Sequence, residues 1–154
     1  MQSAAGLSLK GRALRCLATR EHSRAELERK LRGHEETPGE LAQVLDALAA
    51  KGFISEQRVA DSVVNRRASK LGGQRLRQEL QAKGLAPALV AQALGGLRTS
   101  EQARASEVWQ RKFGAPAADA AGRARQMRFL LARGFEADVV RRVVGGASED
   151  VQEG

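Results

Sequence analysis

Eight arginine and lysine side chains between residues 57 and 98 are the strongest chemical signal in this chain, because only Asp61 and Glu79 oppose them. This segment has a net charge of +6, whereas residues 1–56 and residues 99–154 each have a net charge of +1. Concentrated positive charge attracts polyanions and speeds their encounter with a protein. The candidate partners are therefore nucleic acid, an acidic protein surface and an anionic membrane. The eight residues are Arg58, Arg66, Arg67, Lys70, Arg75, Arg77, Lys83 and Arg98.

Six of these residues are predicted to bind a partner or DNA. Helical periodicity over residues 56–71 turns one apolar stripe toward the core, so the basic residues of this segment point outward or flank the stripe. Arg75 and Arg77 flank Leu76 on the next predicted helix, and a bend at Gly72-Gly73 would join the two groups. The alternative is an ordinary solvated surface, against which the scarcity of carboxylates argues. The six residues are Arg66, Arg67, Lys70, Arg75, Arg77 and Lys83.

Contact with a nucleic-acid backbone is favoured over sequence-specific readout. No predicted helix gathers Arg, Asn and Gln on one exposed face free of carboxylates, which base readout in a groove would require. Stacking of bases on aromatic rings is not supported either, because the aromatic residues have the spacing of core and helix-capping positions. Those residues are Phe53, Trp109, Phe113, Phe129 and Phe135.

Residues suited to catalysis or metal binding are scarce. His22 and His34 are the two histidines, both are expected on the surface near turns, and neither has a Cys or carboxylate at metal-ligand spacing. The glycine pairs Gly72-Gly73 and Gly95-Gly96 lack the Lys-Ser/Thr ending of a phosphate-binding loop. We therefore expect no catalytic residue, no metal site and no cofactor, and we expect that the protein is not an enzyme.

Apolar segments are too short for a membrane protein. No apolar run approaches the roughly 18 residues that a spanning helix needs, and the first eleven residues lack the apolar region of a signal peptide. The single cysteine, Cys16, lies in an apolar stretch and is expected to be buried as a small hydrophobic residue. We expect a cytoplasmic protein that does not bind membranes.

An all-α fold is predicted from periodicity and composition. The chain has one Ile and no Tyr, and its three prolines lie where a helix could begin or has ended. Apolar residues recur at helical spacing throughout. About nine helices are predicted, at 8–20, 24–33, 38–51, 56–71, 73–83, 87–97, 100–113, 119–133 and 136–145.

Short motifs mark the ends of these helices. Ser23 with Glu26, and Thr37 with Glu40, are predicted capping boxes, and Thr99 with Gln102 is a weaker one. A basic residue, a glycine and an apolar residue follow one another at three predicted helix ends, where the glycine would adopt a left-handed conformation and the apolar residue would fold back. These ends are Lys51-Gly52-Phe53, Lys83-Gly84-Leu85 and Arg133-Gly134-Phe135.

Nine helices divide into three units of three. One unit is too small to bury a large core, so neighbouring units are expected to pack together in an elongated, curved row. The predicted units are residues 8–54, residues 55–98 with the strong positive charge, and residues 99–146. Residues 1–7 and 147–154 are predicted to be disordered tails.

Four blocks of residues stand out along the chain. The blocks are Leu17-x-x-Arg20-x-x-Ser23-x-x-Glu26-Leu27-x-x-x-Leu31, Lys51-Gly52-Phe53-Ile54-Ser55-Glu56, Arg67-x-x-x-x-Gly72-x-x-Arg75-Leu76-Arg77-x-Glu79-Leu80-x-x-Lys83-Gly84, and Arg128-Phe129-Leu130-Leu131-Ala132-Arg133-Gly134-Phe135. In this order and at these distances, they resemble the RecX family of bacterial regulatory proteins. The resemblance covers the chain from about Leu14 to Val144.

This resemblance implies tandem three-helix units and modulation of the recombinase RecA. It implies binding along or within the groove of the RecA filament on single-stranded DNA, and inhibition of filament extension, ATP hydrolysis, strand exchange and co-protease activity. Such a protein would act in DNA repair, recombination and the SOS response. The expected partners are the RecA nucleoprotein filament and single-stranded DNA, the latter weakly or through RecA, and we expect a monomer.

Two questions stay open at the level of sequence. A regulator of this kind would either cap the growing filament end or coat its groove. A helical protein that binds DNA without sequence specificity and without RecA is the alternative function, and an inert scaffold is a third. Binding to DNA alone separates these possibilities.

Overall fold

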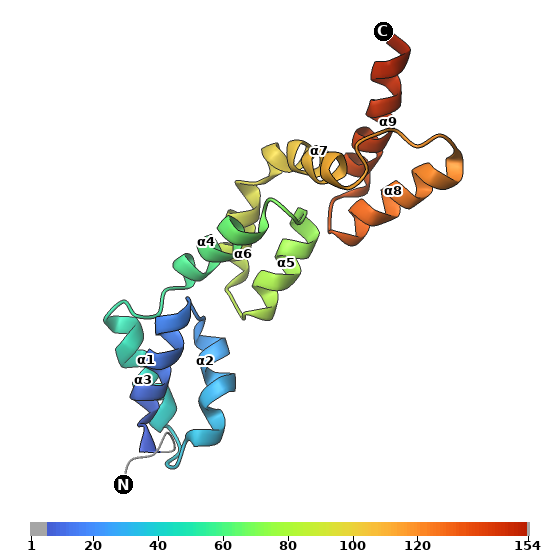
Figure 1. The fold of residues 1–154 in the computed structure, drawn as a ribbon. Coiled ribbons are helices and arrows are strands. Elements are labelled where there is room, and N and C mark those ends of the chain that lie inside the picture. The colour runs from blue at the N-terminus through green and yellow to red at the C-terminus, as the bar shows by residue number, and fades with distance from the viewer. Residues whose placement is uncertain (1–5, 154) are drawn as a thin grey trace.

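The computed structural model describes residues 6–153, and the side chains of residues 6–146. This part of the chain is entirely helical, with no strand, and forms an elongated, curved row of three-helix units (Figure 1). No described helix is both long and apolar enough to cross a membrane. The helices are α1 (Leu9–Thr19), α2 (Arg24–Leu31), η2 (Arg32–His34), α3 (Glu40–Ala50), α4 (Glu56–Arg67), α5 (Gly73–Ala82), α6 (Pro87–Gly95), η3 (Arg98–Ser100), α7 (Glu101–Lys112), α8 (Ala120–Ala132) and α9 (Ala137–Glu153).

Several predicted helix ends are confirmed. Ser23 caps α2 in a complete capping box with Glu26. Gly52, Gly84 and Gly134 all have positive φ directly after α3, α5 and α8. At the end of α8, the Phe135 amide donates to the Leu130 carbonyl and the Gly134 amide donates to the Leu131 carbonyl, which is the pattern of a Schellman motif.

Two predicted capping boxes are wrong. The cap of α3 is Gly39, at φ +90°, and Thr37 makes no side-chain cap. Instead, the Leu41 amide donates to the carboxylate of Glu35 at 2.7 Å, so a residue farther back in the loop satisfies the helix end. Thr99 does not cap α7 either, because Thr99 lies inside the 3₁₀ turn η3 that leads directly into this helix.

Each unit has its own apolar core. The first core contains Leu27, Leu31 and Leu45, the second contains residues such as Val63 and Leu80, and the third surrounds Leu130 and Phe135. The unit boundaries at 8–54, 55–98 and 99–146 stay a prediction. The predicted disordered tails, 1–7 and 147–154, lie mostly outside the residues whose side chains are described.

Two predicted core residues behave differently from expectation. Phe53 was expected to fold back on the end of α3, but its side chain is 48% exposed. Cys16 is half-buried at the edge of the first core rather than fully buried. By contrast, Leu85 and Phe135, which follow the equivalent glycines, are buried.

The junction between the second and third units joins two helix ends. The N-terminus of α5 faces the C-terminus of α8, where the Gly72 amide donates to the Arg133 carbonyl at 2.8 Å and the Gln74 amide donates to the Gly134 carbonyl at 3.1 Å. The Gly73 amide donates to the carboxylate of Glu101, the first residue of α7, at 2.7 Å. The third unit therefore supplies the hydrogen-bond acceptors that the start of α5 lacks within its own helix.

A corresponding arrangement forms the junction between the first and second units. The Ser23 hydroxyl donates to the Lys83 carbonyl at 2.5 Å, which joins the start of α2 to the end of α5. The Arg24 amide donates to the carboxylate of Glu56, the first residue of α4, at 3.2 Å. Both junctions thus use a carbonyl from the end of the next unit's second helix and a glutamate from the start of its first helix.

Glycine permits the close approach at the second junction. A Cβ atom on Gly72 would lie 2.4 Å from the Gly134 carbonyl oxygen and 2.4 Å from the Phe135 amide nitrogen. A Cβ atom on Gly134, which has φ +91°, would lie 2.3 Å from the Cβ atom of Arg75. Backbone atoms cannot move aside as a flexible side chain can, so a larger residue would push the units apart.

Changing Gly72→Ala should lower the free energy of unfolding by about 1–3 kcal/mol, as expected for overpacking against backbone. Gly72 has φ −83°, so the new Cβ atom adds no backbone strain and the cost reports the clash alone. Gly95→Ala is the matched control, because nothing lies within 4 Å of its Cβ position and alanine favours the helix by about 0.5–1 kcal/mol. Urea unfolding measures the free energy of unfolding of both variants. Equal stability of Gly72→Ala and Gly95→Ala would contradict the proposed packing.

Candidate nucleic-acid interface

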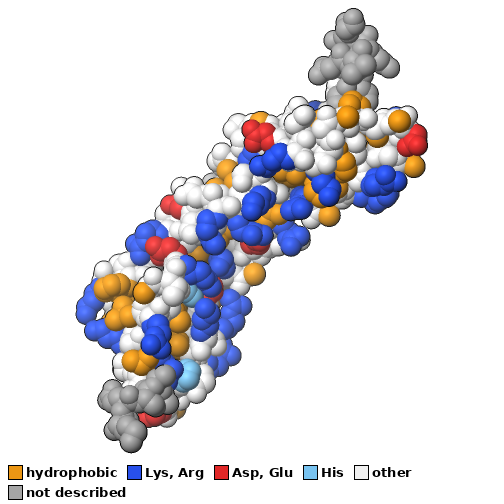
Figure 2. All heavy atoms as spheres, in the orientation of Figure 1, with side chains coloured by type: hydrophobic (Ala, Val, Ile, Leu, Met, Phe, Trp, Pro, Cys, Tyr) orange, Lys and Arg blue, Asp and Glu red, His pale blue; other side chains and the backbone are white. Residues whose placement is uncertain are grey.

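Lys and Arg side chains gather over the middle of one face of the molecule, and few carboxylates lie among them (Figure 2). Two grooves, one at each junction, are lined by these side chains. The first groove is lined by Arg20, Glu26, Arg29, Val63, Arg66, Arg67, Glu79, Ala82 and Lys83. The second groove is lined by Lys70, Val108, Arg111, Lys112, Phe129 and Arg133.

The first groove brings together three of the predicted residues, Arg66, Arg67 and Lys83. Arg67 pairs with Glu79 at 2.8 Å, and Lys83 pairs with Glu26 at 3.2 Å. Arg66 is exposed, and its Nε donates to the Ser62 carbonyl on its own helix. Lys83 therefore joins the first and second units, and Arg67 joins α4 to α5 within the second unit, in addition to contributing positive charge.

Glu26 is the electrostatic centre of the first junction. Its carboxylate is buried and accepts hydrogen bonds from Arg20 at 2.7 Å, from the Ser23 amide at 3.1 Å and from Lys83 at 3.2 Å. Burial alone would raise the pKa of Glu26, but these hydrogen bonds and the charge of Lys83 lower it to about 2. Glu26 stays ionised and joins α2 to the end of α5 at neutral pH.

The second groove contains the predicted residue Lys70 and three cations from the third unit. Lys112 and Arg133 both lie over the ring of Phe129, with Nζ 5.3 Å and Cζ 4.9 Å from its centroid. Arg111 donates to the Ser69 carbonyl at 3.0 Å. Among the described side chains, no carboxylate forms a salt bridge with these four cations.

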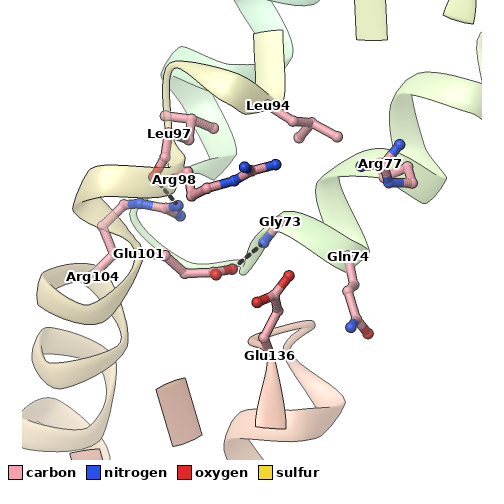
Figure 3. A pocket seen from close by; sticks show the side chains of 9 residues that line it. All are labelled: Gly73, Gln74, Arg77, Leu94, Leu97, Arg98, Glu101, Arg104 and Glu136. Carbon is pink, nitrogen blue, oxygen red and sulfur yellow. Dashed lines mark hydrogen bonds between the residues drawn. The ribbon is translucent and has the colours of Figure 1, made fainter. Parts of the chain in front are cut away.

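Arg75 and Arg77 line neither groove. They leave α5 on either side of Leu76, as predicted, and so point in different directions. Arg75 lies against Gly134 and donates to the Ala132 carbonyl at 3.4 Å. Arg77 instead lines a separate hollow with Arg98, beside the carboxylates of Glu101 and Glu136 (Figure 3). Apart from Arg75, the predicted residues are thus divided among two grooves and a separate hollow, and the joint role of all six in binding stays a prediction.

Five basic groove residues were missed by the sequence analysis. They lie in segments whose charges nearly balance, so counting charge along the chain gives no sign of them. Folding places these cations at the junctions, where Arg20 pairs with Glu26 and the other four form no salt bridge with a described carboxylate. They are Arg20, Arg29, Arg111, Lys112 and Arg133.

Arg104 fixes the turn that carries Lys70. Its half-buried guanidinium donates to the carbonyls of Ala68 and Leu71 at 2.8 and 2.7 Å, and also to that of Leu97. Burial lowers the pKa of Arg104, and the charge of Glu101 opposes this effect. The third unit thereby caps the end of α4 and sets the position of the second groove's outer edge.

His22 is not on the surface, as the sequence analysis expected, but is 1% exposed at the first junction. Its Nε2 accepts from the Lys30 ammonium at 3.0 Å, so its Nδ1 carries the proton and donates to the Arg20 carbonyl at 3.0 Å. Burial and the charges of Arg20 and Lys30 lower the pKa of His22, against the opposing effects of that carbonyl and Glu26. His34 is exposed, as expected.

Stability should fall as the pH drops through the ordinary histidine range near 6.5. The unfolded chain then binds a proton that buried His22 resists, because its folded pKa is lowered, so the unfolded state gains stability. Thermal unfolding between about pH 7.5 and about pH 5.5 measures this change. His22→Gln should flatten the pH dependence, whereas His34→Gln, at an exposed site, should leave it unchanged. An equal slope in wild type and His22→Gln would contradict the assignment.

Within the described residues, no cluster of three or more His, Cys, Asp or Glu side chains has a geometry that could hold a metal ion. The arrangement at the junctions instead suits binding of an extended anion. Cations from two units line each groove, so both grooves depend on how the units pack.

Family models match three consecutive segments of the chain. The model described as the first three-helix domain of RecX matches residues 10–48, the second matches residues 55–94, and the third matches residues 100–144. These segments together account for most of the chain.

Similar proteins carry the same description. A regulatory protein RecX from Leptothrix cholodnii is 57% identical over 138 residues, which cover 90% of this chain and 88% of that protein. Another, from Ralstonia nicotianae, is 49% identical over 148 residues, with 96% and 93% coverage. The crystal structure of RecX from Lactobacillus salivarius has the same fold, with a TM-score of 0.74 at 18% identity, and covers 92% of this chain and 95% of that one.

Proposed function

Because this chain belongs to the RecX family of regulatory proteins, we propose that it is a negative regulator of RecA. It binds the RecA filament on single-stranded DNA and inhibits filament extension, ATP hydrolysis, strand exchange and co-protease activity. In this role it modulates DNA repair, recombination and the SOS response. It acts in the cytoplasm as a monomer and needs no cofactor.

The observation that carries this proposal is the pair of basic grooves at the two junctions of an elongated row of units. A nucleoprotein filament presents negative charge and repeating subunits. A protein that meets such a surface at two points gains affinity from the second contact, because the first contact raises its effective concentration. Complementary charge adds speed and specificity to the encounter.

The six predicted residues contribute to this binding in different ways. Arg66 and Lys70 are exposed and make no salt bridge in the described structure, so they are free to meet the filament. Arg67, Arg75 and Lys83 combine a contact within the protein with an exposed or half-exposed charge. Arg77 extends the basic surface toward the separate hollow.

Binding of DNA without RecA is the alternative function, and the second groove, which contains no carboxylate, favours it. A protein of that kind would inhibit RecA only by occupying its DNA. Inhibition would then require enough protein to cover the DNA sites. A regulator of the filament would act at a small fraction of the RecA concentration.

The single-stranded-DNA-dependent ATPase of the cognate RecA tests the proposal directly. Wild-type protein, titrated from far below stoichiometry, should inhibit hydrolysis well before it equals RecA. Arg66→Glu combined with Lys70→Glu should shift the inhibition curve to at least about tenfold higher concentration, because two attractive charges become repulsive. Circular dichroism should show unchanged helix content.

Arg123→Glu combined with Arg125→Glu is the matched control, because it makes the same charge change at exposed positions outside both grooves. It should inhibit like the wild type. Equal loss of RecA inhibition in both double variants would show that inhibition depends only on the net charge of the protein. No wild-type inhibition until the protein rivals the DNA sites would reject the regulatory role.

A further inference from the structure

The two junction grooves are lined by residues at equivalent positions of successive units. The α4 residues Val63, Arg66 and Arg67 line the first groove. In the same order and at the same spacing, the α7 residues Val108, Arg111 and Lys112 line the second groove. At the opposite wall, the last residue before the left-handed glycine is Lys83 in one copy and Arg133 in the other. Repetition of the units has therefore produced the same basic groove twice.

One position within this shared set differs in charge between the two grooves. Glu79, on α5, stands in the first groove four residues before Lys83, and Phe129, on α8, stands four residues before Arg133 in the second. Glu79 pairs with Arg67, and Glu26 pairs with Arg20 and Lys83, so three cations of the first groove already have anionic partners within 3.2 Å. Phe129 instead offers a ring, over which Lys112 and Arg133 lie.

We propose that the second groove binds the phosphodiester backbone of single-stranded nucleic acid directly, through Lys70, Arg111, Lys112 and Arg133. This inference rests on the proposed function and deepens it, because it names the component of the nucleoprotein filament that this groove meets. The first groove, in which three of the five cations already pair with carboxylates, is not assigned to the nucleic acid.

The physical reason lies in how the four cations are held. A cation that pairs with a carboxylate must give up that pair to bind a phosphate, whereas a cation over an aromatic ring stays charged and available. The ring and the Ser69 carbonyl also restrict Lys112, Arg133 and Arg111, so less conformational entropy is lost on binding. The second groove is thus organised for an anion without being neutralised.

Phosphate is a better match than a protein carboxylate on two grounds. Two of the four cations are guanidinium groups, which bind phosphate oxygens in a bidentate geometry. The cations surround an apolar floor of Val108 and Phe129 in an open groove of about 400 Å³, which leaves room for the sugar between successive phosphates. A specific acidic peptide would need backbone hydrogen-bond partners as well, and the lining side chains offer no acceptor for its amides.

Fluorescence anisotropy with a fluorescein-labelled oligothymidylate, without RecA, tests this assignment. Arg111→Gln combined with Lys112→Gln should weaken binding by about tenfold or more at low salt, and should lower the salt slope by about 1.4 if two phosphate contacts are lost. Arg66→Gln combined with Arg67→Gln removes the same charge from the corresponding positions of the first groove. It should weaken binding by less than about threefold, through long-range charge alone. Arg123→Gln with Arg125→Gln should bind like the wild type.

Three outcomes would overturn the proposal. Equal weakening by both groove variants would mean that net charge alone drives binding. Absence of wild-type binding to the oligonucleotide would mean that the groove does not meet DNA. Unchanged DNA binding by Arg111→Gln/Lys112→Gln, with loss of binding to free RecA, would assign the groove to an acidic protein surface.

Two controls keep these results interpretable. Thermal unfolding followed by circular dichroism shows whether loss of the contact from Arg111 to Ser69 has loosened the junction. Substoichiometric inhibition of RecA by the same wild-type sample tests the proposed function separately. Inhibition without direct DNA binding would overturn the groove assignment alone, whereas DNA binding without inhibition would overturn the regulatory role alone.

Discussion

Capping of a helix by the next unit is the interaction on which this structure depends. The amides at the starts of α2 and α5 are satisfied by Glu56 and by Glu101, and the ends of α5 and α8 close onto the same helix starts. A buried helix end without such partners would be costly. The three small cores are therefore joined by directional hydrogen bonds, which fix the angle between units more tightly than apolar contact would.

The basic grooves follow from those junctions. Neither groove lies within one unit. Lys70 lines the same groove as Arg111 and Arg133 only because the third unit packs against the second. Arg29 lines the same groove as Arg66 only because the second unit packs against the first. The same contacts that stabilise the row also gather positive charge at the two junctions. A change in a junction, such as a side chain at Gly72, would consequently alter both stability and the binding surface.

Local signals explain what could be predicted from sequence. Apolar periodicity and the glycines at 52, 84 and 134 depend on neighbouring residues, and they placed most helices within a few residues of their observed bounds. The exception is α9, which was predicted to end at residue 145 and ends at Glu153. Burial of His22, capping of α3 by Glu35 and separation of Arg77 from the other site residues depend on contacts across loops and units. The missed cations Arg111, Lys112 and Arg133 belong to a segment with nearly balanced charge, so only the folded junction sets them apart.

A cryo-electron microscopy reconstruction of the cognate RecA filament on single-stranded DNA, with this protein bound, would test the central claim most directly. The account predicts that both grooves contact the filament, with the second groove nearest the DNA. Density that places the hollow beside Arg77 and Glu136 against the filament, with the grooves facing solvent, would contradict it.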